Sequence, residues 1–254
     1  MVLIFIFVKK SDDYIIVPLL NSLGFLVSGI IGMYFAIKEL GAKLYLPKWQ
    51  AIKKQFKYSS EFFLSRISVS AYTNTNSFCL GLIGSNIMVG YYVAAEKIYQ
   101  AINGITVPLN GALYPFVAKN KDVKTFKKIF CIAIIINFFV CATMFIFAKP
   151  IITLFYGAEM ENAYKIFRIF CVIASFDIPS ILVGYPLLGA MGRSDVANNS
   201  VILASIVHIF GLTLLYFTGH MNIYSIALMV LVTESVVFLM RFGAIWKYKL
   251  WKTT

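Results

Sequence analysis

Charged residues are scarce in this sequence. Only 13% of its 254 residues are charged, 60% are hydrophobic, and the mean hydropathy is +0.80. A soluble globular domain carries about 25% charged residues, so this composition excludes one. In a membrane every backbone polar group must be satisfied within the protein, which a helix achieves by itself. The apolar runs are also longer than the roughly 9–11 residues of a transmembrane β-strand. We therefore predict an all-α, polytopic transmembrane helical bundle.

Cysteine pairs and enzymatic motifs are missing as well. The four cysteines all lie inside apolar runs and none forms a C-x-x-C pair, so we predict neither a metal site nor a disulfide framework. The sequence has no P-loop, no G-x-G-x-x-G, no H-E-x-x-H and no G-x-S-x-G motif. We therefore expect a protein that is not an enzyme, holds no cofactor, and uses gradients or its own substrate to drive any transport.

About seven apolar runs are long enough to cross a membrane, for which a helix needs about 20 residues. The runs are Tyr14–Ile37, Tyr58–Leu82, Ile87–Val117, Phe126–Ala148, Ala163–Met191, Val196–Phe217 and Ile223–Tyr248. The apolar stub Met1–Val8 has no basic stretch before it, so it does not resemble a signal peptide. It is too short to span, and we predict that it ends a helix that begins outside this chain.

The basic residues gather in alternate gaps between these runs. A net charge of +12 would suggest nucleic acid in a soluble protein, but here we attribute it to membrane topology. Because Lys and Arg accumulate on the cytoplasmic side, we predict a multi-pass bacterial inner-membrane protein with a cytoplasmic C-terminus and no nucleic-acid partner. The basic gaps contain Lys38, Lys43, Lys48, Lys53, Lys54 and Lys57; Lys119, Lys121, Lys124, Lys127 and Lys128; Arg193; and Lys247, Lys249 and Lys252.

The connection from Lys38 to Lys57 is the longest in the chain, and we predict a boundary between two bundles there. Trp49, Ile52 and Phe56 lie among its lysines. The segment is either a short helix on the cytoplasmic face, with its lysines towards anionic lipid, or a solvated linker anchored by one tryptophan.

Polar side chains are unusually frequent in the run Tyr58–Leu82. They include Arg66, Ser68, Ser70, Tyr72, Thr73, Asn74, Thr75, Asn76 and Ser77, and many share a helix face. Such residues can simply hold helices together. Arg66 favours the wall of a cavity instead, because an ionisable residue within a bilayer faces a protein interior or water.

The run Ile87–Val117 carries a second polar face, with residues at positions i, i+4, i+8 and i+11. Its members are Tyr92, Glu96, Gln100 and Asn103. Lys97 adjoins Glu96 but points about 100° away, so the two charges cannot both face lipid. A local ion-pair network is the structural alternative to a cavity wall. Pro108 and Pro115 predict a kink in this run.

Ionisable residues also interrupt the last three runs. Asp177 precedes Pro179, Gly184 and Pro186, which predicts a broken helix whose ends can present backbone groups to a ligand. His208 is either a hydrogen-bonded packing residue or a proton carrier. Glu234 lies in the middle of the last run. Arg241 is i+7 from Glu234 on the same face, and we predict that its side chain reaches the cytoplasmic interface.

The stretch from Ser65 to Lys119 resembles the polysaccharide (O-antigen) flippases of the multidrug/oligosaccharidyl-lipid/polysaccharide exporter (MATE-like) superfamily. The residues that carry the resemblance are Tyr72–Asn76, Leu80–Gly81, Val89–Tyr92, Ala95–Ile98 and Ala112–Pro115. It implies a transporter of twelve helices, built from two six-helix bundles around a central cavity and working by alternating access. Residues 1–40 would then be the remnant of a first bundle, 41–57 a basic cytoplasmic linker, and 58–254 the second six-helix bundle. About four helices of the first bundle would be missing, so the chain would be truncated.

The resemblance also implies a substrate, namely an oligosaccharide on an undecaprenyl diphosphate carrier, for O-antigen or polysaccharide biosynthesis. Membrane lipids, and the polysaccharide polymerase and chain-length machinery, are the other expected partners. The cavity wall would come from Arg66, Tyr72, Asn74, Glu96, Lys97, Gln100, Asn103 and Asp177. Arg66 and Lys97 would meet the diphosphate or an acidic sugar. The candidates for coupling to H⁺ or Na⁺ are Glu96, Asp177, His208 and Glu234.

Two alternatives to the flippase stay open. One is a cation-coupled multidrug exporter of the same superfamily, against which the many Ser, Asn and Tyr side chains argue mildly. The other is a fragment or scaffold subunit that does not transport but binds the assembly machinery or the missing half.

Overall fold

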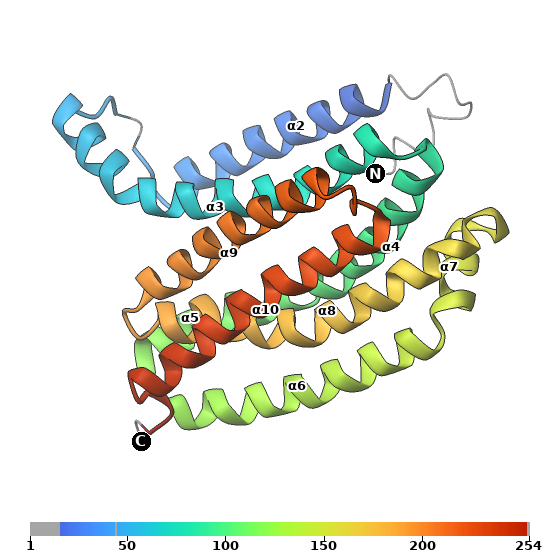
Figure 1. Ribbon diagram of the computed structural model, residues 1–254. Helices are drawn as coiled ribbons and strands as arrows, with labels where there is room; N and C mark the ends of the chain where they lie inside the picture. Colours follow the sequence, from blue (N-terminus) through green and yellow to red (C-terminus); the bar gives the residue numbers. More distant parts are fainter. Residues whose placement is uncertain (1–15, 44, 253–254) are drawn as a thin grey trace. The chain divides into compact units, whose positions relative to one another are not determined.

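The structure is a computed structural model that describes residues 16–43 and 45–252, so the stub Met1–Val8 lies outside the described residues. The described residues form helices joined by short connections, with no β-strand among them (Figure 1). This confirms the predicted all-α, polytopic membrane bundle. The chain divides into two compact units, Met1–Gln55 and Phe56–Thr254.

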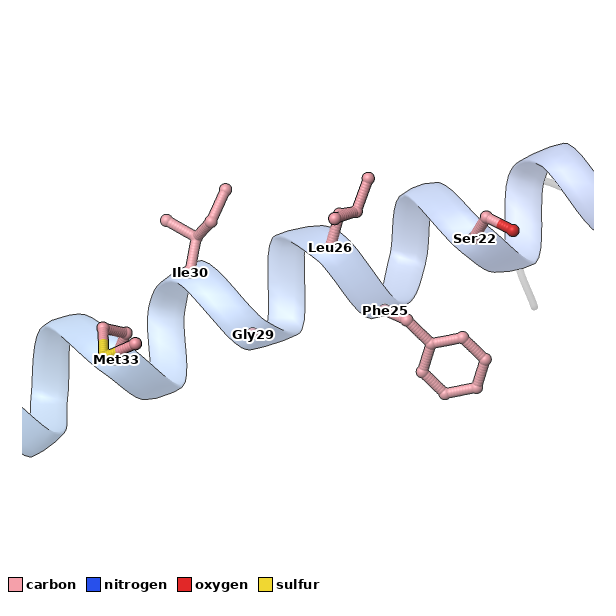
Figure 2. Close-up of a pocket in the computed structure, with 6 residues that line it drawn as sticks. All are labelled: Ser22, Phe25, Leu26, Gly29, Ile30 and Met33. Carbon is pink, nitrogen blue, oxygen red and sulfur yellow. The ribbon is translucent and has the colours of Figure 1, made fainter. Parts of the chain in front are cut away.

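Helix α2 (Ile16–Lys38) belongs to the first unit and matches the predicted run Tyr14–Ile37. Its large apolar side chains are exposed, with Phe25 at 79% and Ile30 at 69%. Figure 2 shows an apolar hollow whose lining residues all come from α2: Ser22, Phe25, Leu26, Gly29, Ile30 and Met33. This helix therefore presents an apolar surface that requires lipid or another helix against it.

Helix α3 (Trp49–Ile83) begins inside the predicted linker and continues into the predicted span as one helix. The described residues 41–43 and 45–48 have no regular secondary structure, and Gly41 has a positive φ of 62°. Pro47 precedes the helix, and no proline follows before Ile83. Residues 49–57 of the predicted linker are thus helical, and they continue into α3 because no proline interrupts the helix after Trp49.

The predicted run Ile87–Val117 forms two helices, α4 (Asn86–Gly104) and α5 (Thr106–Asn120). Pro108 has no N–H to donate to the carbonyl of Gly104, four residues earlier, so the break falls where that bond is missing. The prediction of a kink in this run was correct, although the result is a break between two helices.

Helix α6 (Val123–Ile146) is joined to α8 (Tyr164–Leu182) by the short helix α7 (Ala148–Tyr156) and the 3₁₀ turn η2 (Ala158–Ala163). In this connection the Nζ of Lys149 lies 2.9 Å from Oε1 of Glu161. The hydrogen bond and the charge of Glu161 raise the pKa of Lys149 above its ordinary value.

Helix α8 lies at the centre of the second unit, where it packs against α4, α6 and α10 (Ile223–Lys247) (Figure 1). It continues as the π-helical segment η3 (Val183–Gly189), which packs on α5 and on α9 (Ser194–Phe217). Large fully buried side chains, among them Phe167, Phe170 and Leu187, form the core around it.

The last turn, η4 (Leu250–Lys252), returns to the start of α6. Lys127 donates a hydrogen bond to the carbonyl of Trp251, whose ring is edge-on to Phe126 and Phe130. Five described segments are long and apolar enough to cross a membrane: Pro18–Lys38, Val123–Ile146, Ala158–Gly189, Ser194–Phe217 and Ile223–Lys247. The predicted count of about seven is thus approximate, because α3 is too polar and the α4–α5 run is broken.

Candidate functional site

Two buried carboxyl groups meet in the middle of the second unit. Asp177 of α8 and Glu234 of α10 are only 7% and 6% exposed, and their side chains act on each other electrostatically. Because two like charges buried near each other are unfavourable, a proton on one of the two stabilises this arrangement. The structure thus pairs two residues that are 57 positions apart and that the sequence placed only in separate runs.

Three side chains donate to this acidic pair. The hydroxyl of Tyr72 lies 2.9 Å from Oε1 of Glu234. The hydroxyl of Tyr99 and Nδ2 of Asn103 each lie 2.6 Å from Oδ2 of Asp177. Helices α3, α4, α8 and α10 therefore converge on the pair. Of the predicted cavity residues, Tyr72, Asn103 and Asp177 belong to this network.

The sequence prediction missed Tyr99. It lies four residues before Asn103 and thus on the same helix face, but tyrosine is so common in this chain that its presence gave no signal. Its ring stacks on Phe170, with centroids 5.1 Å apart. Packing therefore fixes the hydroxyl that reaches Asp177.

Arg241 occupies the break between α8 and η3. Its guanidinium donates to the carbonyl of Ser180 at 2.9 Å and to Oγ of Ser200 at 3.1 Å, and it is 7% exposed. The prediction that it reaches the cytoplasmic interface was wrong, because these buried acceptors hold it inside the bundle. Its charge acts on both Asp177 and Glu234, although neither is within ion-pair distance among the described contacts.

Gly184 makes room for this arginine. The glycine has non-helical backbone angles, φ −57° and ψ −109°, and a Cβ at this position would lie 2.9 Å from Nη1 of Arg241. The break predicted from Pro179, Gly184 and Pro186 is thus present. In an apolar medium a broken helix needs new partners for its carbonyl groups, and Arg241 supplies one at Ser180.

His208 is completely buried and bonded at both ring nitrogens. Nδ1 lies 2.7 Å from Oγ1 of Thr233, whose own hydroxyl donates to a backbone carbonyl, so Nδ1 carries the proton. Nε2 lies 2.8 Å from Oδ1 of Asn76. An oxygen cannot donate to Nε2, so a neutral ring requires this amide to be turned, with its NH₂ donating to Nε2 and its oxygen accepting from the hydroxyl of Tyr92, with which Asn76 also interacts. A neutral His208 is then fully satisfied, which favours the packing role over that of a proton carrier.

The remaining predicted cavity residues are more exposed and do not join the acidic pair. Arg66 and Asn74 are exposed on α3, and Asn74 donates only to the carbonyl of Ser70, at 2.8 Å. Nζ of Lys97 lies 3.3 Å from Oε1 of Gln100, and both are exposed on α4. Glu96 is half-buried and interacts with the charge of Lys97. The predicted set therefore divides in two. Tyr72, Asn103 and Asp177 belong to the buried acidic network. We call the exposed residues the exposed polar group: Arg66, Asn74, Lys97 and Gln100.

The described residues contain no cluster of three or more His, Cys, Asp or Glu side chains that could hold a metal ion. All four cysteines are free.

The comparisons with known proteins agree with the membrane architecture. Residues 1–121 match a family described as polysaccharide biosynthesis protein. The chain is 27% identical over 249 residues to a protein described as an O-antigen transporter in Shigella dysenteriae, a match that covers 96% of this chain. It is 28% identical over 116 residues to a protein of the same description in Escherichia coli K12, a match that covers 46% of this chain and 28% of that protein.

The chain spans 62% of the length of the Shigella protein. No solved structure gives a significant match to the chain described here. The relatives are named as transporters and not as enzymes, in agreement with the missing enzymatic motifs. The resemblance stated from the sequence is confirmed.

Proposed function

We propose that this chain, which is a relative of the polysaccharide (O-antigen) flippases of the MATE-like superfamily, moves lipid-linked oligosaccharide repeat units across the bacterial inner membrane. The units would be carried on undecaprenyl diphosphate and would pass from the cytoplasmic to the periplasmic leaflet by alternating access. The C-terminus would be cytoplasmic, and the polysaccharide polymerase and chain-length machinery would be partners of the chain.

The acidic pair carries the proposal of ion coupling. Asp177 and Glu234 are buried together in an apolar bundle, where a proton on one of them avoids the repulsion of two like charges. Losing that proton would place two like charges side by side, with only Arg241 to offset them. The pair must then separate or recruit a cation. Since the pair joins α8 to α10, such a separation would rearrange the bundle.

The exposed polar group carries the proposal of an anionic, sugar-containing substrate. Arg66 and Lys97 are exposed cations on α3 and α4, and a cation at membrane depth is expected to face an anion or water. Asn74 and Gln100 are exposed beside them and would form hydrogen bonds to sugar hydroxyl groups. Glu96, half-buried beside Lys97, is the second candidate for coupling.

Complementation tests this function. In a bacterial strain that lacks its O-antigen transporter, the chain would be produced alone or together with the N-terminal part of the Shigella relative. Long-chain lipopolysaccharide would then be measured on gels. We expect restoration by the unchanged sequence, and loss of most of it in Asp177→Asn and in Glu234→Gln at equal membrane levels.

Glu159→Gln is the matched control, because Glu159 is an exposed acid in η2, outside the acidic network. It should restore lipopolysaccharide like the unchanged chain. Full activity of both Asp177→Asn and Glu234→Gln would overturn the proposed coupling. Resistance to cationic drugs without restored lipopolysaccharide would identify the multidrug exporter instead.

A further inference from the structure

Three aromatic rings from three segments lie close together on the second unit, and none of them is buried. They are Phe62 of α3, Tyr114 of α5 and Tyr185 of η3, which are 48%, 46% and 37% exposed. The rings of Phe62 and Tyr185 stack at an angle of 22°, with centroids 6.2 Å apart. A Cβ on Gly189 would lie 3.0 Å from the ring of Tyr185 and 3.6 Å from that of Tyr114, so both rings lie against this glycine. We call the three rings the aromatic platform.

Tyr185 is anchored from behind. Its hydroxyl bonds to Oδ1 of Asn198, a residue of α9 that is 2% exposed. The missing side chain of Gly189 lets the Tyr185 ring approach the backbone closely. The segment η3 itself is fixed at the helix break by Arg241. Rings that are ordered in advance lose little conformational freedom when something binds to their open faces.

Arg66 adjoins the platform. It lies four residues after Phe62 on α3, and thus on the same helix face. Its charge acts on Tyr185, and the described contacts give it no ion pair. A planar guanidinium group in this setting selects an anion such as phosphate, two of whose oxygens it can bind through two parallel hydrogen bonds.

We propose that the aromatic platform and Arg66 form one binding site for a glycosyl phosphate. Arg66 would hold the phosphate, and the platform would stack against the first sugar attached to it. The C–H groups of a sugar ring carry partial positive charge and suit the negative face of an aromatic ring. This inference rests on the proposed function. It names the part of the proposed substrate that this site would bind, namely the phosphate and the first sugar.

A phospholipid headgroup would also supply a phosphate to Arg66, but phosphatidylglycerol carries no sugar ring for the platform. Binding experiments can therefore separate the two sources. The full chain would be placed in lipid nanodiscs, and native mass spectrometry would give Kd values for three probes. These are undecaprenyl diphosphate carrying one N-acetylhexosamine, undecaprenyl diphosphate alone, and phosphatidylglycerol.

We expect Phe62→Leu and Tyr185→Leu each to raise the Kd for the sugar-bearing probe about three- to tenfold, with little change for undecaprenyl diphosphate. Arg66→Gln should raise the Kd for both diphosphates by about tenfold or more. Phe63→Leu is the matched control, since Phe63 is an exposed neighbour that points about 100° away on α3. Tyr185→Phe keeps the ring and loses only the bond to Asn198, so it should raise the Kd for the sugar-bearing probe less than Tyr185→Leu does.

Equal weakening of both diphosphates by the platform variants would overturn the inference, as would no weakening at all. Phosphatidylglycerol that displaces the sugar-bearing probe at equal Kd would assign Arg66 to a lipid headgroup instead. In each of these cases the unchanged chain still binds the diphosphates, so the proposed function survives. If the unchanged chain bound neither diphosphate, the proposed function would fail together with this site.

Discussion

Helices α6 and α8 pack against each other, yet their surroundings differ. α6 is the more hydrophobic of the two, and most of its apolar surface is exposed: Ile132, Ile136 and Phe139 are 58%, 58% and 65% exposed. The less hydrophobic α8 carries Asp177 and is buried over most of its length. In a water-soluble protein the order would be the reverse.

The difference shows what holds this bundle together. Lipid tails are as apolar as leucine, so burying an isoleucine of α6 against protein gains little over leaving it in lipid. Close packing and polar contacts decide instead which helix lies inside. In α8 these are the acidic pair and the carbonyl that Arg241 holds. α6 contributes one buried polar side chain, Asn137, whose Oδ1 accepts from the thiol of Cys141.

Among the substitutions that test this comparison, one at the helix break after α8 should reduce stability most. Gly184→Ala would place a Cβ 2.9 Å from Nη1 of Arg241 and displace the guanidinium from Ser180. Because a buried charged donor would lose its acceptor, we expect the free energy of unfolding to fall by about 2–3 kcal/mol. Unfolding in detergent, followed by circular dichroism, would measure it.

Gly111 is the matched control for this substitution. It also lies inside a helix, α5, but nothing is within 4 Å of where its Cβ would be. Gly111→Ala should leave stability unchanged or raise it by up to about 1 kcal/mol, because alanine is the better helix former. If the two variants behaved alike, the break at Gly184 would not be a tightly packed site.

The helical architecture could be predicted from sequence because its causes are local. Long apolar runs require helices in lipid, and Pro108 removes one hydrogen bond at a definite place. The break near Gly184 also followed from nearby residues. These features depend on neighbours along the chain, so a single sequence contains them.

The candidate site could be predicted only in part, because its causes are not local. The sequence marks Asp177 and Glu234 as ionisable side chains that are energetically unfavourable inside a membrane. Their pairing, however, depends on how α8 and α10 pack. Arg241 was assigned to the interface because arginine usually reaches water when its stem is long enough. The acceptors that hold it inside, at Ser180 and Ser200, exist only after η3 and α9 have folded around it.

A smaller loss of stability is expected from a substitution at the contact between α6 and α8. Nδ2 of Asn137 donates to the carbonyl of Ala174 at 3.2 Å, and both groups are buried. Asn137→Ala should lower the free energy of unfolding by about 0.6–1 kcal/mol, because hydrogen bonds between membrane helices contribute roughly that much. The neighbouring Ile136→Ala should cost less, because lipid replaces protein around that side chain. A larger loss from Ile136→Ala in the same unfolding assay would contradict the comparison.

Substitution in the first turn of α6 should change the stability of the protein least. Asp122 is its N-cap: its carboxylate accepts from the N–H of Thr125 at 2.9 Å and from the hydroxyl of Thr125 at 2.6 Å. These bonds lower the pKa of Asp122 below its ordinary value of 3.8. The cap therefore stabilises the fold above that value and loses its effect as the pH falls through the lowered pKa. Asp122→Ala should reduce the unfolding midpoint slightly at neutral pH, and the difference from the unchanged chain should vanish in strong acid. A difference that persisted there would show that Asp122 acts through packing and not through its charge.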